Sequence, residues 1–212
     1  MMKIKNELKI MGATPFLISA TLAVLYTLVA VFSGELLDLS CAGFEVIFPF
    51  YAAIAVGEWG KIKADDNFEV IAAQTNSLFQ WIATRALTVF AIVSLFAAVA
   101  MVSVVLLRDE MPLCELALTY FAPAFFLSSL GALFNLCLPA EHSTALLCGL
   151  IWLSTMLLQA ALRFPGVEYV YLFIRYAGDP NGIWIYNKLI LIAASLILWG
   201  ILYFLCKRNP RK

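Results

Sequence analysis

The sequence contains few charged residues, and the two signs are equal in number. Lys, Arg, Asp and Glu make up 13% of the 212 residues, whereas residues of the set AVILMFWYC make up 63%. A typical soluble domain has about 25% charged and about 45–50% apolar residues, so this composition excludes a soluble cytosolic enzyme. The 14 basic residues only balance the 14 acidic ones. The chain therefore lacks the positive charge that nucleic-acid binding needs, and we expect no nucleic-acid partner.

Histidine is nearly absent, and the common catalytic motifs are missing. His142 is the only histidine, no H-E-x-x-H or G-x-S-x-G motif is present, and residues 57–61 lack the spacing and the hydroxyl residue of a phosphate loop. The five cysteines form no C-x-x-C pair. We expect no catalytic residue, no metal site and no cofactor in this chain. The cysteines are interpreted as packing residues, with a disulfide between Cys41 and Cys114 left open.

Long apolar segments make up most of the chain. Five uncharged runs of 18 to 25 residues and a sixth run interrupted only by Glu45 are present. About 20 helical residues cross a hydrocarbon core that is about 30 Å thick, and continuous runs do not have the alternating pattern of a β-barrel strand. The sequence predicts a single all-α membrane domain over residues 1–212. Its six transmembrane helices are expected at about residues 14–34, 40–57, 86–107, 113–138, 143–162 and 187–206.

The distribution of Lys and Arg indicates the orientation of the spans. With both termini inside, ten of the 14 basic residues fall in inner segments and four fall outside. Because basic residues are retained on the cytoplasmic side, we expect both termini to be cytoplasmic. Residues 1–12 carry Ile4, Leu8 and Met11 on one side and three lysines elsewhere. This pattern predicts an amphipathic N-terminal helix at the membrane surface.

The connector between the second and third spans has a helical pattern that a passive loop does not need. Asp66 and Glu69 suit the start of a helix, where acidic side chains face the positive end of its dipole. Residues of one helix face then recur at the expected spacing: Phe68, Ile71, Ala72, Thr75, Leu78, Phe79 and Ile82. We predict a short cytoplasmic helix at about residues 65–78. It either lies in the lipid headgroups or docks on another protein.

Two acidic residues and an aromatic connector mark the outer side. Glu45 lies inside the second span and Glu115 at the outer edge of the fourth, and ionisable residues in spans are functional candidates. We expect Glu45 to reach the outer interface or to pair with Arg108, or alternatively to serve transport. The aromatic connector 163–188 is interpreted as a belt folded onto the outer leaflet, or alternatively as a lid over an outward exit. The candidate pathway or outer-gate residues are Glu45, Glu115, Tyr169, Tyr171 and Phe173.

This layout resembles the permease subunit of a type-2 ATP-binding-cassette (ABC) exporter. Members of that family have six spans with both ends inside, an amphipathic N-terminal helix, a cytoplasmic helix between spans two and three, and a membrane-hugging segment between spans five and six. The sequence-specific part of the resemblance is residues 65–85, DDNFEVIAAQTNSLFQWIATR. Asp65 or Asp66 matches the first acid of the family pattern, and Glu69 matches the second. An aliphatic run, residues 70–72, follows as in the family, whereas the family's glycine and proline are replaced.

The resemblance implies that the chain is a transporter subunit and not an enzyme. Its cytoplasmic helix would be a coupling helix that docks on a separate ABC ATPase subunit, and that subunit would bind ATP and Mg²⁺. The docking residues so implied are Asp65, Asp66, Phe68, Glu69, Ile71, Ala72 and Thr75. A second permease chain, identical or paralogous, would complete the complex in the lipid bilayer of a prokaryotic cytoplasmic membrane. The expected activity is export of an amphipathic cargo such as a peptide, drug or lipid.

Two alternatives from other functional classes stay open. One is a membrane-embedded enzyme that acts on lipid or peptide and uses His142, Glu141 or Glu45 as acid or base. The other is a non-catalytic self-protection protein that binds a membrane-active peptide. A permease would lose its effect without a partner ATPase, whereas a self-protection protein would keep it.

Overall fold

The structure, a computed structural model, describes residues 12–32, 37–61, 78–107, 112–138, 142–179 and 182–208. Among these residues every regular element is helical and no strand is present. The predicted N-terminal helix, apart from Gly12, and the predicted helix at 65–78, apart from Leu78, lie outside the described residues. The all-helical class expected from the continuous apolar runs is confirmed.

Ten helical elements are described, and six stretches of them are long and apolar enough to cross a membrane. α3, η1 and α4 form one such stretch, Leu39–Trp59, and α8 continues into η2 to form another, Ser143–Arg163. The elements are α2 (Thr14–Phe32), α3 (Leu37–Cys41), η1 (Ala42–Ile47), α4 (Phe48–Trp59), α6 (Leu78–Leu107), α7 (Leu113–Cys137), α8 (Ser143–Leu157), η2 (Leu158–Arg163), η3 (Val167–Tyr169) and α9 (Trp184–Arg208). The protein is therefore built as a multi-pass membrane protein.

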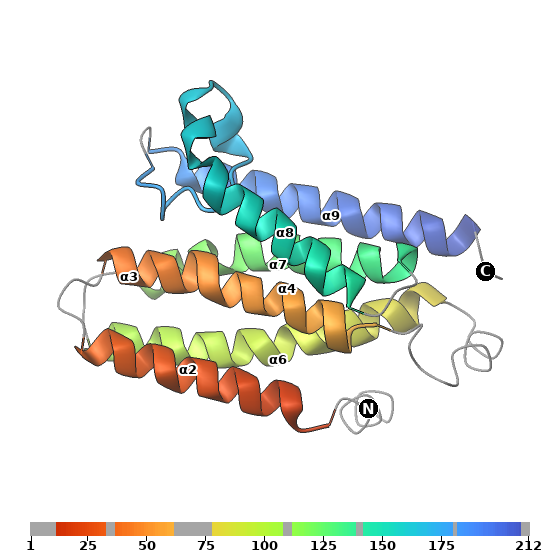
Figure 1. Ribbon diagram of the computed structural model, residues 1–212, viewed down its shortest axis with the longest axis horizontal. Helices are drawn as coiled ribbons and strands as arrows, with labels where there is room; N and C mark the ends of the chain where they lie inside the picture. The colour runs from red at the N-terminus through yellow and green to blue at the C-terminus, as the bar shows by residue number, and fades with distance from the viewer. Residues whose placement is uncertain are drawn as a thin grey trace.

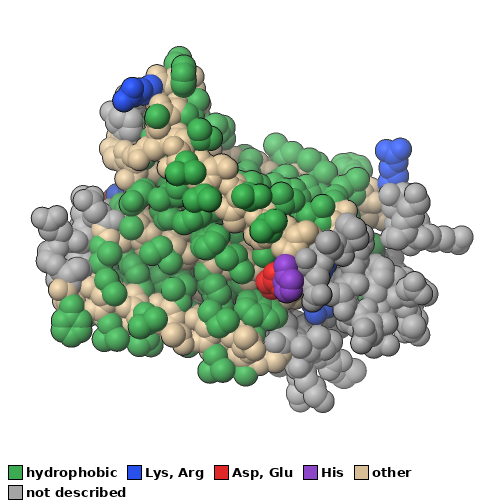
Figure 2. All heavy atoms as spheres, in the orientation of Figure 1, with side chains coloured by type: hydrophobic (Ala, Val, Ile, Leu, Met, Phe, Trp, Pro, Cys, Tyr) green, Lys and Arg blue, Asp and Glu red, His purple; other side chains and the backbone are tan. Residues whose placement is uncertain are grey.

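α4 and α7 form the centre of the bundle. α4 packs against α7, α8 and α6, while α7 also packs against α9, and α2 packs against α6 (Figure 1). The central position is reflected in burial, since most residues of Leu39–Trp59 are buried, whereas only Thr144 and Cys148 are buried in Ser143–Arg163. Apolar side chains cover most of the surface over the peripheral helices (Figure 2). Such a surface suits contact with lipid, whose tails are as apolar as these side chains.

The two described ends of the chain lie at the same end of the bundle. Thr14 begins α2 and Arg208 ends α9 at this end, which an even number of spans requires (Figure 1). We call it the inner end, after the charge-based prediction, and it also holds the end of α4 and the start of α8. The opposite end, which carries the start of α3 and residues 164–179, is called the outer end.

Two spans begin earlier than the sequence pattern predicts. α6 begins at Leu78 instead of near residue 86, and α9 begins at Trp184 instead of near residue 187. In both cases a basic residue limits the uncharged run but lies inside the helix. Arg85 is buried and its Nε donates to Trp59 O at 3.0 Å, and Lys188 is fully buried. A cation that has a partner inside the protein does not end a span.

The second span contains a π-helical turn, η1, that ends two residues before Pro49. Phe48 N–H bonds to Gly43 O, five residues back, where an α-helix would use the residue four back. Pro49 has no N–H to give to Glu45 O, so the α-helical ladder is interrupted at this point. From α8, Trp152 Nε1 donates to the neighbouring Val46 O at 3.0 Å. The turn therefore receives a donor from another helix, and Glu45 lies within it.

Candidate functional site

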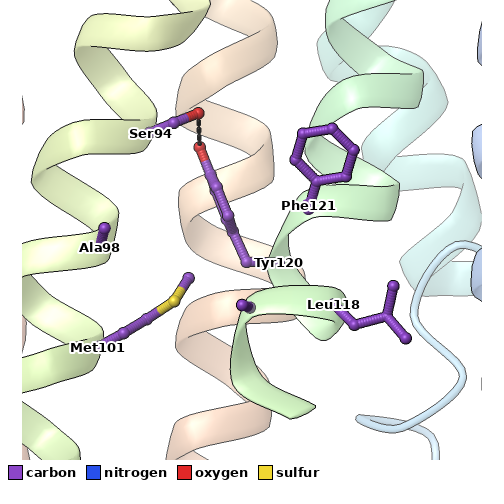
Figure 3. A pocket seen from close by; sticks show the side chains of 7 residues that line it. Ser94, Ala98, Met101, Leu118, Tyr120 and Phe121 are labelled. Carbon is purple, nitrogen blue, oxygen red and sulfur yellow. Dashed lines mark hydrogen bonds between the residues drawn. The ribbon is translucent and has the colours of Figure 1, made fainter. Parts of the chain in front are cut away.

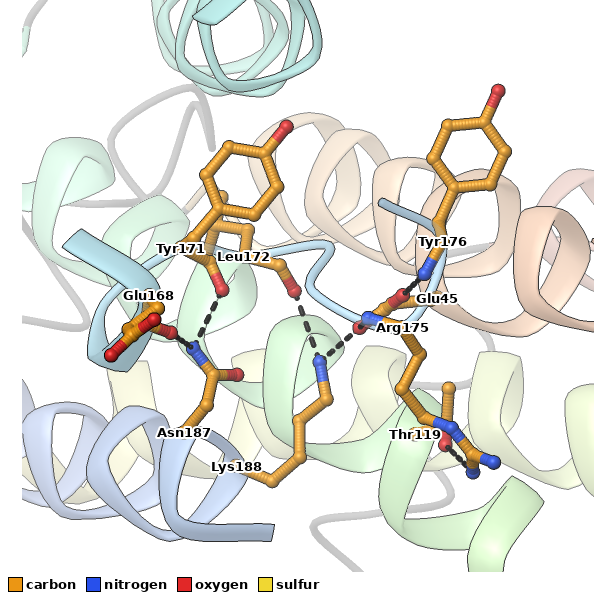
Figure 4. Close-up of polar contacts among 9 residues, drawn as sticks. All are labelled: Glu45, Thr119, Glu168, Tyr171, Leu172, Arg175, Tyr176, Asn187 and Lys188. Carbon is orange, nitrogen blue, oxygen red and sulfur yellow. Dashed lines mark hydrogen bonds and ion pairs between the residues drawn. The ribbon is translucent and has the colours of Figure 1, made fainter. Parts of the chain in front are cut away.

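A buried ion pair at the outer end joins the second and sixth spans. Glu45 of η1 and Lys188 of α9 are both completely inaccessible to solvent, and Lys188 Nζ contacts Glu45 Oε1 (Figure 4). A buried charge is costly unless it is paired and its remaining hydrogen-bonding positions are filled. The partners that fill these positions come from one segment, Val167–Ala177, which we call the strap.

The strap is held through its main chain by three side chains of the bundle. Glu45 accepts hydrogen bonds from the N–H groups of Arg175 and Tyr176 at 3.2 and 2.6 Å. Lys188 Nζ donates to Leu172 O at 3.1 Å. Asn187 Nδ2 donates to Tyr171 O and to Glu168 O, both at 2.8 Å (Figure 4). Non-helical backbone at this position needs such partners, because lipid offers none.

Arg175 of the strap forms a second set of contacts, with α7 and α9. Its Nη2 pairs with Glu115 Oε2 at 3.1 Å and its Nη1 donates to Thr119 Oγ1 at 3.1 Å. The guanidinium carbon lies 4.3 Å from the centre of the Trp184 ring, a cation–π distance. The same residue thus gives its main chain to Glu45 and its side chain to Glu115. Two acidic residues from different spans act on one residue of the strap.

The centre of the strap also inserts apolar side chains into the bundle. Phe173 and Ile174 are completely buried, and Leu172 is nearly so. Tyr171 directs its O–H to Thr155 O at 2.8 Å, and burial raises the pKa of this phenol. The raised pKa favours the protonated form, which is the form that donates this hydrogen bond. The strap is therefore a part of the packed core at the outer end.

Four of the five candidate gate residues lie around this network. Glu45 and Glu115 bind the strap, while Tyr171 and Phe173 belong to it and are buried. Tyr169, in η3, is 40% exposed and lies at the surface. The exposed aromatic residues of the connector agree with a belt on the outer leaflet. The buried centre of the strap agrees better with a lid over the outer end.

Three expectations for single residues have different outcomes. Glu45 is fully buried, and among the described residues it pairs with Lys188, while Arg108 lies outside the described residues. Cys41 and Cys114 are not joined by a disulfide. The residues predicted to dock an ATPase, at positions 65–75, also lie outside the described residues.

Sequence reasoning missed Lys188, Arg175 and Asn187. Lys188 and Arg175 are two of the four basic residues of the predicted outer segments, and Asn187 is a neutral residue at a span boundary. One signal was available, because an acid inside a span requires a partner of opposite charge. Four basic residues lie on the predicted outer side, however, and only the packing of α9 against α7 brings one of them to Glu45.

A second polar contact lies at the inner end. His142 Nδ1 and Glu58 Oε2 are 2.7 Å apart and join the start of α8 to the end of α4. The His142 side chain is 71% exposed and the Glu58 side chain is 29% exposed, so the pair lies at the surface. Within the described residues, no group of three or more His, Cys, Asp or Glu side chains could hold a metal ion. The pair connects two helix ends at the surface.

A shallow apolar hollow of about 390 Å³ lies between α6 and α7. Ala98, Met101 and Phe121 are among its lining residues (Figure 3). Its two hydroxyl groups, on Ser94 and Tyr120, bond to each other at 2.9 Å. The hollow therefore presents an almost entirely apolar wall, as a lipid-facing groove between two spans does.

Comparison with known proteins does not assign the chain to a family. No family model matches it, and no curated protein or solved structure matches it either. The functional argument therefore depends on the arrangement of the chain's own residues.

Proposed function

We propose that this protein is the permease subunit of a type-2 ABC exporter. The observation that carries the proposal is the position of the two long connectors between the spans. One connector, residues 62–77, lies at the inner end between the second and third of the six spans. The other contains the strap and lies at the outer end between the fifth and sixth spans. The strap does not extend away from the bundle but inserts into its outer end. A closed outer end and an inner connector suited to docking are what an exporter permease needs.

The energy source in this proposal is a separate ATPase subunit. The chain has no phosphate loop of its own. Residues 65–75 would dock on the ATPase, with Phe68 giving apolar contact and Glu69 giving charge. ATP-driven closure of the motor would move this connector and shift the spans between inward-facing and outward-facing arrangements.

The cargo in this proposal is amphipathic and leaves through the outer end. The described outer connectors are short, so a large extracellular binding domain is not part of the described chain. The predicted outer segments carry more acidic than basic residues. A cationic or amphipathic peptide suits this charge, and the strap would be the outer gate that it passes.

The proposal is tested by complex formation with an ATPase in a reconstituted membrane. The full chain is co-expressed and purified with an ABC ATPase from the same organism, and ATP-stimulated cargo movement is measured in proteoliposomes. The double variant Phe68→Ala with Glu69→Lys is expected to lose the complex and at least tenfold of the stimulated transport. The matched control is Leu146→Ala with Glu141→Lys, which makes the same charge reversal and a similar truncation of an apolar side chain in and beside the other inner connector, and is expected to keep both.

Two outcomes would overturn the proposal in different ways. Intact complex and transport in the Phe68 and Glu69 variant would exclude this connector as the docking site. Full cellular activity without any ATPase would exclude the permease function itself. If that ATPase-independent activity also disappeared in His142→Ala while the protein stayed folded, the membrane-enzyme alternative would replace it.

A further inference from the structure

The main chain of the strap is held mainly by charged and polar side chains of the bundle. Glu45, Asn187 and Lys188 take up two N–H groups and three C=O groups of residues 168–176. Glu45 is the common element, because it bonds two strap amides and also pairs with Lys188. Removing Lys188 from Glu45 would therefore leave a buried carboxylate and free the carbonyl of Leu172 in one event.

The strap is bounded by two glycines in the left-handed region. Gly166 has φ of +90° and Gly178 has φ of +98°, and a Cβ at either position would have no atom within 4 Å. Both sites are thus conformationally special and sterically open, as hinge positions require. Inside these limits the strap is cross-linked to itself, since Ala177 N–H bonds to Phe173 O at 3.0 Å and Tyr171 N–H bonds to Val167 O at 3.0 Å. The strap therefore has an internal turn on each side of Leu172 that does not depend on the bundle.

We propose that the strap opens as a unit about Gly166 and Gly178, and that the Glu45–Lys188 pair is the latch that keeps it closed. A buried ion pair is often no more stabilising than an apolar pair of similar size, but an apolar pair could not bond the Arg175 and Tyr176 amides and the Leu172 carbonyl as Glu45 and Lys188 do. An ion pair fixes one register and has two distinct states, paired and separated. This property suits a closure that must open and then return to the same position.

The latch deepens the proposed function, since it rests on that function for its role as an outer gate. The opening motion itself depends only on contacts within this chain. It can therefore be measured without an ATPase, a cargo or a second subunit of another kind. A failed transport assay would therefore refute the exporter function, whereas a failed latch experiment would refute only the opening of the strap.

The test is amide hydrogen exchange of the full chain in lipid nanodiscs, read by mass spectrometry. The latch variant is Glu45→Gln with Lys188→Met, which removes both charges together and leaves no unpaired charge to unfold the bundle. Peptides that cover residues 170–178 are expected to exchange at least tenfold faster than in the unmodified protein. Peptides from α4 and α7 are expected to stay protected within twofold.

The hinge is tested by Gly178→Ala, which leaves every latch residue in place. Alanine is strained in the left-handed region, so the closed strap is disfavoured and its exchange is expected to rise about fivefold. The matched control is Gly200→Ala in α9, where a Cβ also meets no atom within 4 Å but the backbone is helical. This control is expected to leave strap exchange unchanged.

Three results would overturn the inference. Faster exchange at Arg175 and Tyr176 alone in the latch variant would show a local hydrogen bond and not a latch. Loss of protection that spreads through α4 and α7 would show that the pair supports the whole fold. Unchanged strap exchange in Gly178→Ala would exclude the hinge. Absence of transport in the unmodified protein would refute the exporter function but would leave the latch result standing.

Discussion

Gly43 has no side chain because the ring of Tyr26 occupies the space in which a Cβ would lie. This ring is fixed on two sides. Its O–H donates to Leu39 O at 2.7 Å, and its face and edge contact Phe44 and Phe48 at centroid distances of 5.0 and 5.5 Å. Tyr26 therefore cannot move aside without losing a buried hydrogen bond. The close approach of α2 to the second span depends on this glycine.

We predict that Gly43→Ala destabilises the protein by about 1–3 kcal/mol, the usual cost of overpacking a filled site. The measurement is thermal or denaturant unfolding in detergent, followed by helical circular dichroism. Gly149→Ala in α8 is the control, because its Cβ would meet Phe50 at 3.7 Å, an ordinary contact. Alanine in that helix is expected to stabilise slightly. Equal stability of the two variants would show that Tyr26 adapts easily.

At the residue scale, the sequence predicted that Glu45 is special but not which residue it binds. A carboxylate inside an apolar run is visible without a structure, because its burial needs a partner. The choice of Lys188 depends on how the sixth span is placed relative to the second, and both contact α7. The main-chain groups of the strap left no signal at all, since every residue carries an N–H or C=O group of the same kind.

At the scale of single elements, η1 shows how a helix irregularity is supported by its neighbours. Pro49 breaks the α-helical ladder, and Trp152 of α8 supplies a donor to Val46 O. The same indole stacks on Phe50 with centroids 4.3 Å apart. α8 is otherwise little buried, so this tryptophan is a principal attachment of α8 to the second span.

We predict that Trp152→Phe costs about 1–3 kcal/mol more than Trp199→Phe, because only the first change leaves a buried carbonyl without its donor. Trp199 Nε1 is also buried but has no hydrogen-bond partner among the described residues. The two substitutions remove the same atoms, so the difference between their unfolding free energies compares a bonded indole N–H with a buried one that has no partner among the described residues. A difference near zero would mean that Val46 O finds another donor.

The predicted start and end of each span depended on where the nearest charged residue lies in the sequence. The uncharged runs located all six helices, and the central residues of each run are helical in the structure. The predicted starts of α6 and α9 were wrong because Arg85 and Lys188 end the uncharged runs. A charge count does not show that a cation is paired or hydrogen-bonded inside the protein. The π-helical turn was also invisible, although Pro49 marked the position beside it.

At the scale of the whole molecule, the arrangement provides its own test of topology. α7 carries two exposed cysteines near its opposite ends, Cys114 at the outer end and Cys137 at the inner end. Twenty-five residues of helix span roughly 36 Å, more than a hydrocarbon core of about 30 Å. The other three cysteines are buried. Two native thiols therefore report on the two sides of the membrane.

We predict that a membrane-impermeant maleimide labels Cys114 in intact cells and labels Cys137 only after permeabilisation. The labels are distinguished in Cys137→Ser and Cys114→Ser variants, and the ratio of labelling with and without permeabilisation is expected to change at least fivefold for Cys137. The reverse pattern would show that the chain is inserted with its termini outside, which would contradict the orientation inferred from the basic residues.

The Glu45–Lys188 pair also sets an order for biosynthesis. Glu45 leaves the ribosome 143 residues before Lys188, an interval of roughly 7–30 s at about 5–20 residues per second. During this time the second span contains an acid whose partner does not yet exist, at an insertion cost of up to about 3 kcal/mol for an acid at the bilayer centre. The outer end can therefore close only after the last helix is inserted. A nascent chain that stops after its fifth span would display Glu45 unpaired, and this exposed acid distinguishes an unfinished chain from a finished one.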